Sequence, residues 1–317
     1  MKEIGGYFEL ETFARNEYYK DAIALNTARN AFVYLAKAKN ISKVYLPYYL
    51  CDSVYKVCER EKIDYEFYHI DSDFLPLFQK KLENDEYLYV VNFFGQLSDD
   101  VIKKLKAEHK NIIVDNVQAF FSDPVEDIDT LYSCRKFFGV PDGAYLISDC
   151  KRIAAMDTDV SMERMKHILG RFEGNSASDY YGDFQKSDEF FEELPVKHMS
   201  KLTHNILSAV DYETVKNKRN SNWKLLHSEL GETNKLNLVD PDAPYMYPYY
   251  CEDGINLRKA LAFKKIFIPT LWPNVLDLQG CELEVEYAEN ILPLPIDQRY
   301  TEEDMKKIIY ELKMLKG

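Results

Sequence analysis

The sequence predicts an α/β protein in which a mostly parallel sheet with flanking helices is followed by a small C-terminal α+β domain. Two observations support this. Short apolar, strand-like runs alternate with helical segments through the first half, as in sheets whose strands are joined by helices. Residues 235–317 instead mix short strands with helices and end in an amphipathic helix. We therefore expect a large α/β domain over 1–210, and a long connecting helix with the small domain over 211–317.

The elements of the first half follow from local patterns. Apolar residues recur at helical spacing in 26–39, and 98–109 is an amphipathic helix with an N-cap. Another helix begins near Asp52 or Ser53, either of which can cap it. Strands are expected at 43–47, 64–71, 87–94, 111–116 and 143–148. In such folds ligands bind beyond the carboxyl ends of the strands.

The second half has a different pattern. Residues 157–232 are polar and mostly helical, and 174–188 looks loosely ordered. A long helix is expected over 211–230. An extended Pro/Tyr-rich connection is expected over 241–250, because proline blocks a helix and tyrosine packs well with its hydroxyl in water. Thr301 is expected to cap the C-terminal helix.

Charge and composition exclude several classes of protein. The formal net charge of -13 argues against nucleic acid as the main partner, because binding a phosphate backbone needs concentrated lysine and arginine. No apolar run is long enough to cross a membrane, and the N-terminus has no secretory pattern. The 6 cysteines include no CxxC pair, and the 6 histidines form no HxH or HExxH motif. We expect a cytoplasmic protein with reduced cysteines, no metal site, and no nucleic-acid or membrane partner.

Three local features carry the candidate chemistry, and the first is ALNTARNAF. Small and polar residues there precede a helix, so backbone N–H groups near Thr27, Ala28 and Arg29 could bind a phosphate. Ordinary capping by Asn26 or Thr27 is the preferred reading of this feature alone. Arg29 could neutralise a phosphate or equally lie on the helix surface.

The second feature is IIVDNVQAFF, which places Asp115 at the carboxyl end of a buried strand and Gln118 just beyond it. A carboxylate that ends an apolar run must be capped, paired or liganded, because uncompensated burial is costly. Asp115 could hold a protonated heterocyclic nitrogen, or it could be an ordinary turn or helix-cap aspartate.

The third feature is YSCRKFFGVPDGAYL, where Lys136 lies in a turn between strand-like segments. Phe137 and Phe138 beside it could exclude water and free the lysine amine as a nucleophile or base. A lone lysine is more often a surface residue. Here, however, the helix start, the aspartate and the lysine fall on the same side of one predicted sheet. A phosphate site, an acidic partner and a reactive lysine are what pyridoxal phosphate (PLP) requires.

Taken in order along nearly the whole chain, these segments resemble the DegT/StrS sugar aminotransferase family, whose members are PLP enzymes of the aspartate-aminotransferase fold (fold type I). LNTARNAFVYLAKA resembles the helix start that receives the cofactor phosphate, and VDNVQAFF resembles the element that meets the cofactor ring. YSCRKFFGVPDGAYL resembles the segment with the cofactor-bound lysine, although the step from serine to lysine is shorter here. ILPLPIDQRYTEEDMKKI resembles the closing segment of the small domain.

The resemblance implies a role for each candidate residue. Lys136 would bind the PLP aldehyde and then act as general base and acid, while Asp115 would keep the ring nitrogen protonated. The other implied cofactor contacts are Gln118 beside the ring, Ser133 and the helix start at Thr27, Ala28 and Arg29 around the phosphate, and Tyr49 stacked on the ring. Trp272 is expected to pack in the core rather than face the substrate.

The resemblance also implies a homodimer and a reaction. An amino-acid donor, expected to be glutamate, would supply an amino group to a keto-sugar, expected to be nucleotide-linked, in cell-surface polysaccharide or secondary-metabolite synthesis. A second reading keeps PLP but makes the protein a sugar dehydratase or lyase, because the sequence does not separate elimination from transamination. A third makes it a non-catalytic scaffold with the PLP-enzyme fold, given the altered lysine segment and a middle region shorter than in the family.

Overall fold

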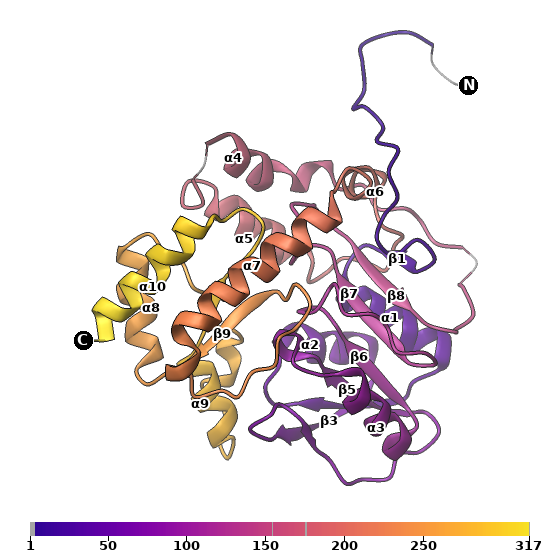
Figure 1. Ribbon diagram of the computed structural model, residues 1–317. Coiled ribbons are helices and arrows are strands. Elements are labelled where there is room, and N and C mark those ends of the chain that lie inside the picture. The colour runs from indigo at the N-terminus through magenta and orange to yellow at the C-terminus, as the bar shows by residue number, and fades with distance from the viewer. Residues whose placement is uncertain (1–3, 154, 175, 317) are drawn as a thin grey trace.

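The computed structural model describes residues 4–153, 155–174 and 176–316. Figure 1 shows a large sheet with its helices, coloured indigo to magenta, beside a smaller unit coloured orange to yellow. Within the described ranges the large sheet has eight strands in the order β1-β8-β7-β6-β5-β2-β3-β4. They are β1 (Ile23–Leu25), β2 (Lys43–Pro47), β3 (Asp64–Ile70), β4 (Pro76–Leu77), β5 (Glu86–Val91), β6 (Ile112–Asp115), β7 (Asp129–Ser133) and β8 (Ala144–Ile147).

The centre of the large sheet is parallel and its margins are antiparallel. Strands β3, β2, β5, β6 and β7 run parallel to one another. Strand β8 runs antiparallel to β7, β1 antiparallel to β8, and β4 antiparallel to β3. Every residue of β6 and β7 is buried, as expected for strands covered on both faces. The predicted mostly parallel sheet is confirmed, and the carboxyl ends of its parallel strands meet at one edge.

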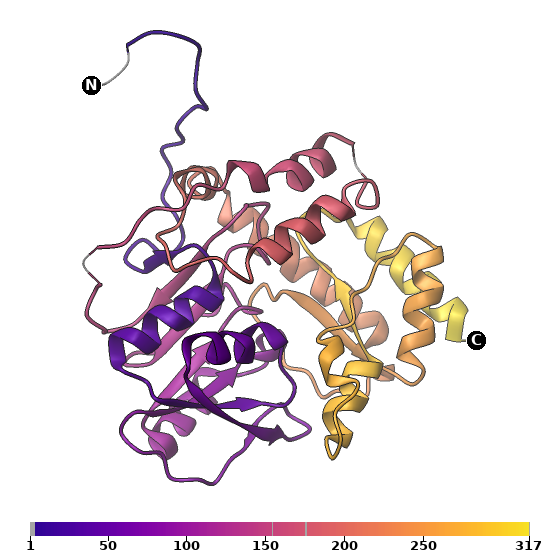
Figure 2. The ribbon, with the colours of Figure 1, turned by 180° about the vertical axis from the view of Figure 1, so that it is seen from behind.

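Three helices of the first half cover this sheet: α1 (Ala28–Lys39), α2 (Asp52–Glu61) and α3 (Asp99–His109). Helix α1 packs on β7, β8 and α2, and Figure 2 shows α1 and α2 in front of the sheet. Ser98 caps α3 by accepting a hydrogen bond from Val101 N, as its sequence predicts. The N-cap of α2 is Cys51 rather than Asp52 or Ser53, and its side chain makes no capping bond.

Two segments depart from their expected structure. The strand predicted over 87–94 ends at Val91, and Phe93–Gly95 forms the 3-10 turn η1, because Phe94 adopts a φ of 55° that a strand cannot contain. The segment 174–188 was expected to be loosely ordered, but its residues 181–188 belong to helix α5 (Tyr181–Phe190). The rest of this middle region holds η2 (Met162–Arg164), α4 (Lys166–Gly174) and α6 (Lys201–Leu207).

The smaller unit is built on a two-stranded antiparallel sheet of β9 (Met246–Tyr250) and β10 (Ile291–Pro295). The Pro/Tyr-rich stretch 241–250 was expected to be an extended connection, and its second half, Met246–Tyr250, forms strand β9. The remaining elements are α7 (Tyr212–Leu230), η3 (Gly231–Thr233), α8 (Gly254–Phe263), η4 (Pro273–Val275), α9 (Glu282–Asn290) and α10 (Glu302–Lys316). The division of the chain at 210/211 stays a prediction.

The unit has its own hydrophobic cluster, which includes Trp223, Tyr247, Leu261, Leu292 and Met305 from α7, β9, α8, β10 and α10. The long helix expected over 211–230 is confirmed as α7, whose N-cap Asp211 accepts from Thr214 N. Thr301 and Asp304 exchange hydrogen bonds at the start of α10, which is the predicted cap. Among the residues described, no helix combines the length and the apolar character that a membrane span requires.

Candidate active site

A cavity of about 320 Å³ opens at the carboxyl ends of the parallel strands. Its wall includes Val91 and Asp115, which end β5 and β6, and Leu50 and Cys51, which follow β2. Seven of the eight residues singled out in the sequence line it together: Thr27, Ala28, Arg29, Asp115, Gln118, Ser133 and Lys136. The eighth, Tyr49, is not in the wall.

The start of helix α1 forms one side of the cavity. Thr27 is its N-cap, with φ of -145°, and its Oγ1 accepts a hydrogen bond of 3.1 Å from Asn30 N. The first N–H groups of a helix have no carbonyl partner within it, and the helix dipole makes this end positive. The capping role and the binding role are therefore compatible: Thr27 fixes the helix start, while the N–H groups of Ala28 and Arg29 lie at the end that attracts anions.

Asp115 ends β6 as a buried carboxylate. Its Oδ1 accepts from Val117 N at 2.8 Å, and its Oδ2 accepts from the Tyr89 hydroxyl at 2.8 Å. Burial raises the pKa of the Asp115 carboxyl, while the hydrogen bonds and the charge of Lys136 act in the opposite direction. Each carboxylate oxygen has a second lone pair. The group can therefore still accept a proton-bearing nitrogen from a ligand, and a positive charge there would offset the cost of its burial.

Gln118 is held in one orientation beside the cavity. Its Oε1 accepts a hydrogen bond of 2.9 Å from Phe94 N. Because the amide oxygen is engaged, the side chain has its NH₂ group to offer a ligand. The same bond holds Phe94 in its left-handed conformation, so Gln118 also stabilises the turn after β5.

Lys136 lies in the turn that follows β7. The N–H groups of Phe137 and Phe138 both bond to Cys134 O, at 3.0 and 2.9 Å, and both phenyl rings are buried. The Lys136 amine points to the cavity side, where its Nζ lies 5.2 Å from the centroid of the Tyr245 ring. The two phenylalanines thus fix the backbone of the turn from the core, and leave the amine at the cavity.

This lysine turn is also held from the smaller unit. Phe137 O accepts a hydrogen bond of 2.7 Å from Gln298 Nε2. The neighbouring Arg219 on α7 is buried and bonds to Gln298 Oε1 at 3.0 Å and to Pro244 O at 2.9 Å. On the other side, Gly143 N donates to Asn26 O at 2.6 Å, which ties the end of the loop to the start of α1.

Comparison with solved structures finds chains of the same architecture. A DegT/DnrJ/EryC1/StrS aminotransferase from Brucella abortus matches with a TM-score of 0.65 at 16% identity, over 93% of this chain and 86% of that one. NtdA from Bacillus subtilis, with bound cofactor PMP, gives 0.65 at 14% identity, over 92% and 72%. DesI, in the presence of its TDP-sugar product, gives 0.64 at 13% identity, over 92% and 80%. The chain has the fold of these three proteins.

The expected fold type I is therefore confirmed. No family model matches the sequence, and the comparison with curated proteins finds no match. At these identities the fold is shared while most side chains differ, so the chemistry must be argued from this chain's own cavity.

Several wall residues were not singled out as site residues in the sequence, and Arg135 is the most prominent. Its guanidinium lies 3.8 Å from the centroid of the Phe191 ring and 3.5 Å from Asp188 Oδ1. Burial lowers the pKa of Arg135 to about 10, while Asp188 acts to raise it. The sequence feature that could have identified Arg135 as a site residue is its position next to Lys136. Asp188 and Phe184 come from α5, and nothing in their local sequence indicates that α5 reaches this cavity.

The cavity wall has an excess of positive charge. Arg29, Arg135 and Lys136 contribute cations, while Asp115 and Asp188 contribute carboxylates. With the positive end of α1 in the same wall, this distribution suits an anionic ligand that also carries a basic nitrogen.

The aromatic residues of the wall differ from the expected one. Tyr49 is fully buried, with its ring 4.6 Å from Trp272 and 5.4 Å from Phe93. Trp272 was expected to pack in the core. It packs edge-on against Tyr49, and it also lines the cavity. Tyr49 therefore packs behind Trp272, which lines the cavity, and the structure does not place Tyr49 where it would contact a ligand.

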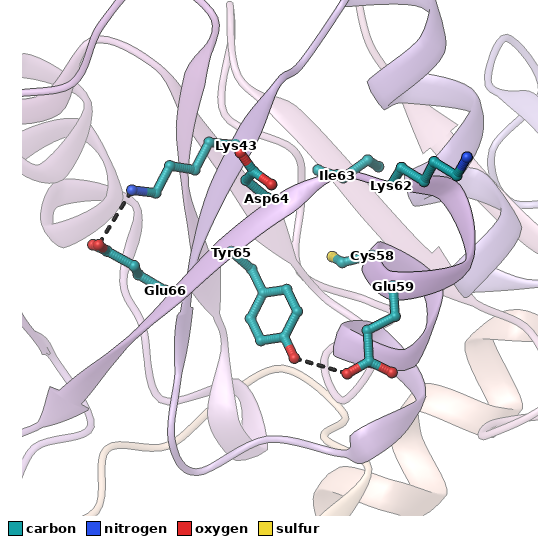
Figure 3. A pocket seen from close by; sticks show the side chains of 8 residues that line it. All are labelled: Lys43, Cys58, Glu59, Lys62, Ile63, Asp64, Tyr65 and Glu66. Carbon is teal, nitrogen blue, oxygen red and sulfur yellow. Dashed lines mark hydrogen bonds and ion pairs between the residues drawn. The ribbon is translucent and has the colours of Figure 1, made fainter.

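A second hollow, of about 460 Å³, lies away from these residues at the start of β2 and β3. Figure 3 shows two interactions between its side chains: Lys43 pairs with Glu66 at 3.3 Å, and the Tyr65 hydroxyl donates to Glu59 at 2.9 Å. Such pairs at an exposed surface contribute little to stability, and within the described part of the chain the hollow contains no group with a reactive partner, so we assign no chemistry to it.

Proposed function

We propose that the protein is a PLP-dependent sugar aminotransferase of the DegT/StrS type. The observation that supports this most directly is that the Lys136 amine and the buried Asp115 carboxylate line one cavity, together with the positive start of α1. The fold shared with the aminotransferase from Brucella abortus supports it independently. NtdA was solved with PMP, a form of the same cofactor.

The donor set of the cavity fits PLP. The cofactor needs an amine for its aldehyde, an anionic partner for its ring nitrogen and cationic or N–H partners for its phosphate. Lys136 supplies the first and Asp115 the second. For the phosphate the cavity offers the first N–H groups of α1, the guanidinium of Arg29 and the hydroxyl of Ser133.

In the proposed reaction PLP supplies an electron sink for the negative charge that develops on the donor's α-carbon. Lys136 Nζ holds the cofactor and, once released, takes the proton from that α-carbon as a general base. In the second half-reaction the same amine delivers a proton to the sugar carbon that receives the amino group. Asp115 favours the protonated ring nitrogen, because an ion pair stabilises a carboxylate that burial otherwise disfavours.

We propose an amino acid, in the simplest case glutamate, as the donor, and a nucleotide-linked keto-sugar as the acceptor in polysaccharide or secondary-metabolite synthesis. The support for the nucleotide is the fold shared with DesI, which was solved with its TDP-sugar product. The excess positive charge of the cavity wall agrees with an acceptor that carries phosphate groups. We place the reaction in the cytoplasm, where reduced thiols such as the six free cysteines persist.

The test compares wild type with Lys136→Ala, and with Lys103→Ala as a matched control on the exposed face of α3. Wild type and the control, incubated with PLP, should develop a visible absorbance band. After borohydride reduction, PLP should be found on the peptide that contains Lys136. Lys136→Ala should lose the band, and turnover should fall by more than about 10⁴-fold, the upper range for removing a general base.

Incubation with glutamate distinguishes the aminotransferase hypothesis from the lyase hypothesis. An aminotransferase should release 2-oxoglutarate and leave the cofactor in its amine form, PMP, whereas a lyase should not stop at that point. Turnover that persists in Lys136→Ala would disprove the assignment of the lysine. No absorbance change in wild type at saturating PLP would favour a scaffold without activity.

We also propose that the protein is a homodimer. The N-terminal segment projects away from the body of the molecule in Figure 1, and it exposes Ile4, Tyr7 and Phe8 at 98%, 99% and 98%. Exposed apolar side chains gain free energy when they are buried against another surface. Light scattering should give twice the chain mass for wild type, and a smaller dimer fraction on dilution for a Tyr7→Ser/Phe8→Ser variant. A monomeric wild type would contradict the proposal.

A further inference from the structure

Three potential metal ligands converge at the joint between β3 and α9, away from the cavity. His69 lies near the end of β3, Cys281 is the N-cap of α9, and Glu284 lies in the first turn of that helix. One donor atom from each residue lies within 4.8 Å of the other two. His69 and Glu284 are 215 positions apart in the chain, which explains why no local motif reveals the group.

Two of the three donors are buried. Glu284 is 1% exposed, and its Oε1 accepts from Ile70 N at 3.1 Å and lies 3.1 Å from His69 Nδ1. Cys281 is 2% exposed, and its thiol makes a weak contact of 3.6 Å with Gln279 O. The His69 side chain is 46% exposed, so an ion could reach the group from solvent on that side.

The electrostatic surroundings are acidic. Cys281 is the N-cap of a helix whose first turn carries the two carboxylates of Glu282 and Glu284. Asp71, Asp73 and Glu286 contribute negative charge at the neighbouring Tyr287. A hydrogen bond between His69 and Glu284 explains the position of those two side chains. It does not explain a buried thiol beside a buried carboxylate, an arrangement that a divalent cation would stabilise.

We propose that His69, Cys281 and Glu284 bind a zinc ion. Zn²⁺ takes imidazole nitrogen, thiolate sulfur and carboxylate oxygen in tetrahedral geometry. Zinc bonds of about 2.0–2.3 Å place tetrahedral donor atoms roughly 3.3–3.8 Å apart. Small side-chain rotations would bring the three donor atoms, which now lie within 4.8 Å of one another, to that spacing. The three residues leave a fourth position for water.

The ion would join the two units of the molecule. Tyr287, on the same helix as Glu284, donates to Ser72 O at 3.1 Å and packs 5.9 Å from Tyr49. Tyr49 in turn supports Trp272 in the cavity wall. A zinc ion at the β3–α9 joint would therefore stabilise the wall from a distance, and the proposal does not depend on the reaction at Lys136.

The test uses the full chain freed of metal by a chelator and then titrated with Co²⁺ or Zn²⁺. Co²⁺ bound to a thiolate gives a charge-transfer absorbance band, which we expect in difference spectra at one equivalent per chain. Cys281→Ser should abolish this band. Glu284→Gln and His69→Gln should weaken Zn²⁺ binding by at least about 100-fold, the upper range found when a ligand loses its hydrogen-bonding partner.

The matched control is Cys150→Ser, which removes a partly exposed thiol outside the cluster and should bind both ions like wild type. Zn²⁺ should also raise the melting temperature of wild type and of this control, but not of the cluster variants, whose folding is checked by circular dichroism. A Co²⁺ band that survives Cys281→Ser, or Zn²⁺ affinities that are equal in wild type and all three cluster variants, would overturn the proposal.

Discussion

The buried guanidinium of Arg219 should be a principal support of the lysine turn, and Arg219→Met tests this. Arg219 is 1% exposed and donates to Gln298 Oε1 at 3.0 Å, Pro244 O at 2.9 Å and Tyr245 O at 3.2 Å. Its contact with Phe137 O, at 3.5 Å, is too long to count. The guanidinium also lies 4.5 Å from the Phe137 ring centroid.

The expected loss of stability follows from these contacts. A hydrogen bond to a charged group contributes about 1.5–3 kcal/mol, so three contribute roughly 5–9 kcal/mol. Burying the guanidinium costs several kcal/mol, and methionine does not carry that cost. We therefore expect Arg219→Met to lower the free energy of unfolding by about 3 kcal/mol. Because Gln298 also holds Phe137 O, the variant should attach PLP to Lys136 less completely as well.

The assay is urea unfolding of the protein without cofactor, followed by the absorbance titration with PLP. Lys224→Met is the matched control, because Lys224 is exposed on the same helix and should change stability by less than about 0.5 kcal/mol. A loss below about 1 kcal/mol for Arg219→Met, close to that of the control, would refute the reasoning. It would mean that the carbonyl groups find other donors once the guanidinium is gone.

Two further predictions concern the same region. Gly143 has φ of +117°, and an added Cβ would lie 2.9 Å from Thr203 Cγ2, so Gly143→Ala should destabilise the protein by about 2–3 kcal/mol in urea unfolding. Gly182→Ala, in α5 where nothing lies within 4 Å, should instead stabilise it by up to about 1 kcal/mol, and equal effects would contradict this account. Asp115 has a raised pKa in the fold, so the folded state retains its proton longer than the unfolded state does, and stability should fall as pH rises above the ordinary value of 3.8. Unfolding measured between pH 4 and pH 7 should show a steeper fall for wild type than for Asp115→Asn, and parallel curves would contradict the raised pKa.

Local patterns were sufficient to predict most of the sheet and its helices. The apolar run at β6, the cap at Ser98 and the cap at Thr301 are each set by interactions within a few residues. The exceptions arise from contacts between distant segments. Phe94 leaves the strand because Gln118 holds its N–H, and the Pro/Tyr-rich stretch becomes β9 because β10 pairs with it.

The residues of the candidate site also fall into those that the sequence could identify and those that it could not. Asp115 and Lys136 could be selected in the sequence because each is a polar residue at the end of an apolar run, where burial demands a partner. Tyr49 was chosen for its residue type. Its neighbours Leu50 and Cys51 face the cavity instead, because the ring of Tyr49 packs between Trp272 and Phe93. Residue type alone does not indicate the direction of a side chain after a strand.

The sequence by itself determined which residues carry reactive or charged groups, and which strand ends hold them, because alternation and capping depend on near neighbours. Only the tertiary structure decided that α5 brings Asp188 to Arg135, that Gln298, held by Arg219, bonds to the lysine turn, and that His69 meets Cys281 and Glu284. Those contacts join segments far apart in the chain. They depend on how the layers pack, and packing is set by the whole hydrophobic core rather than by any short stretch.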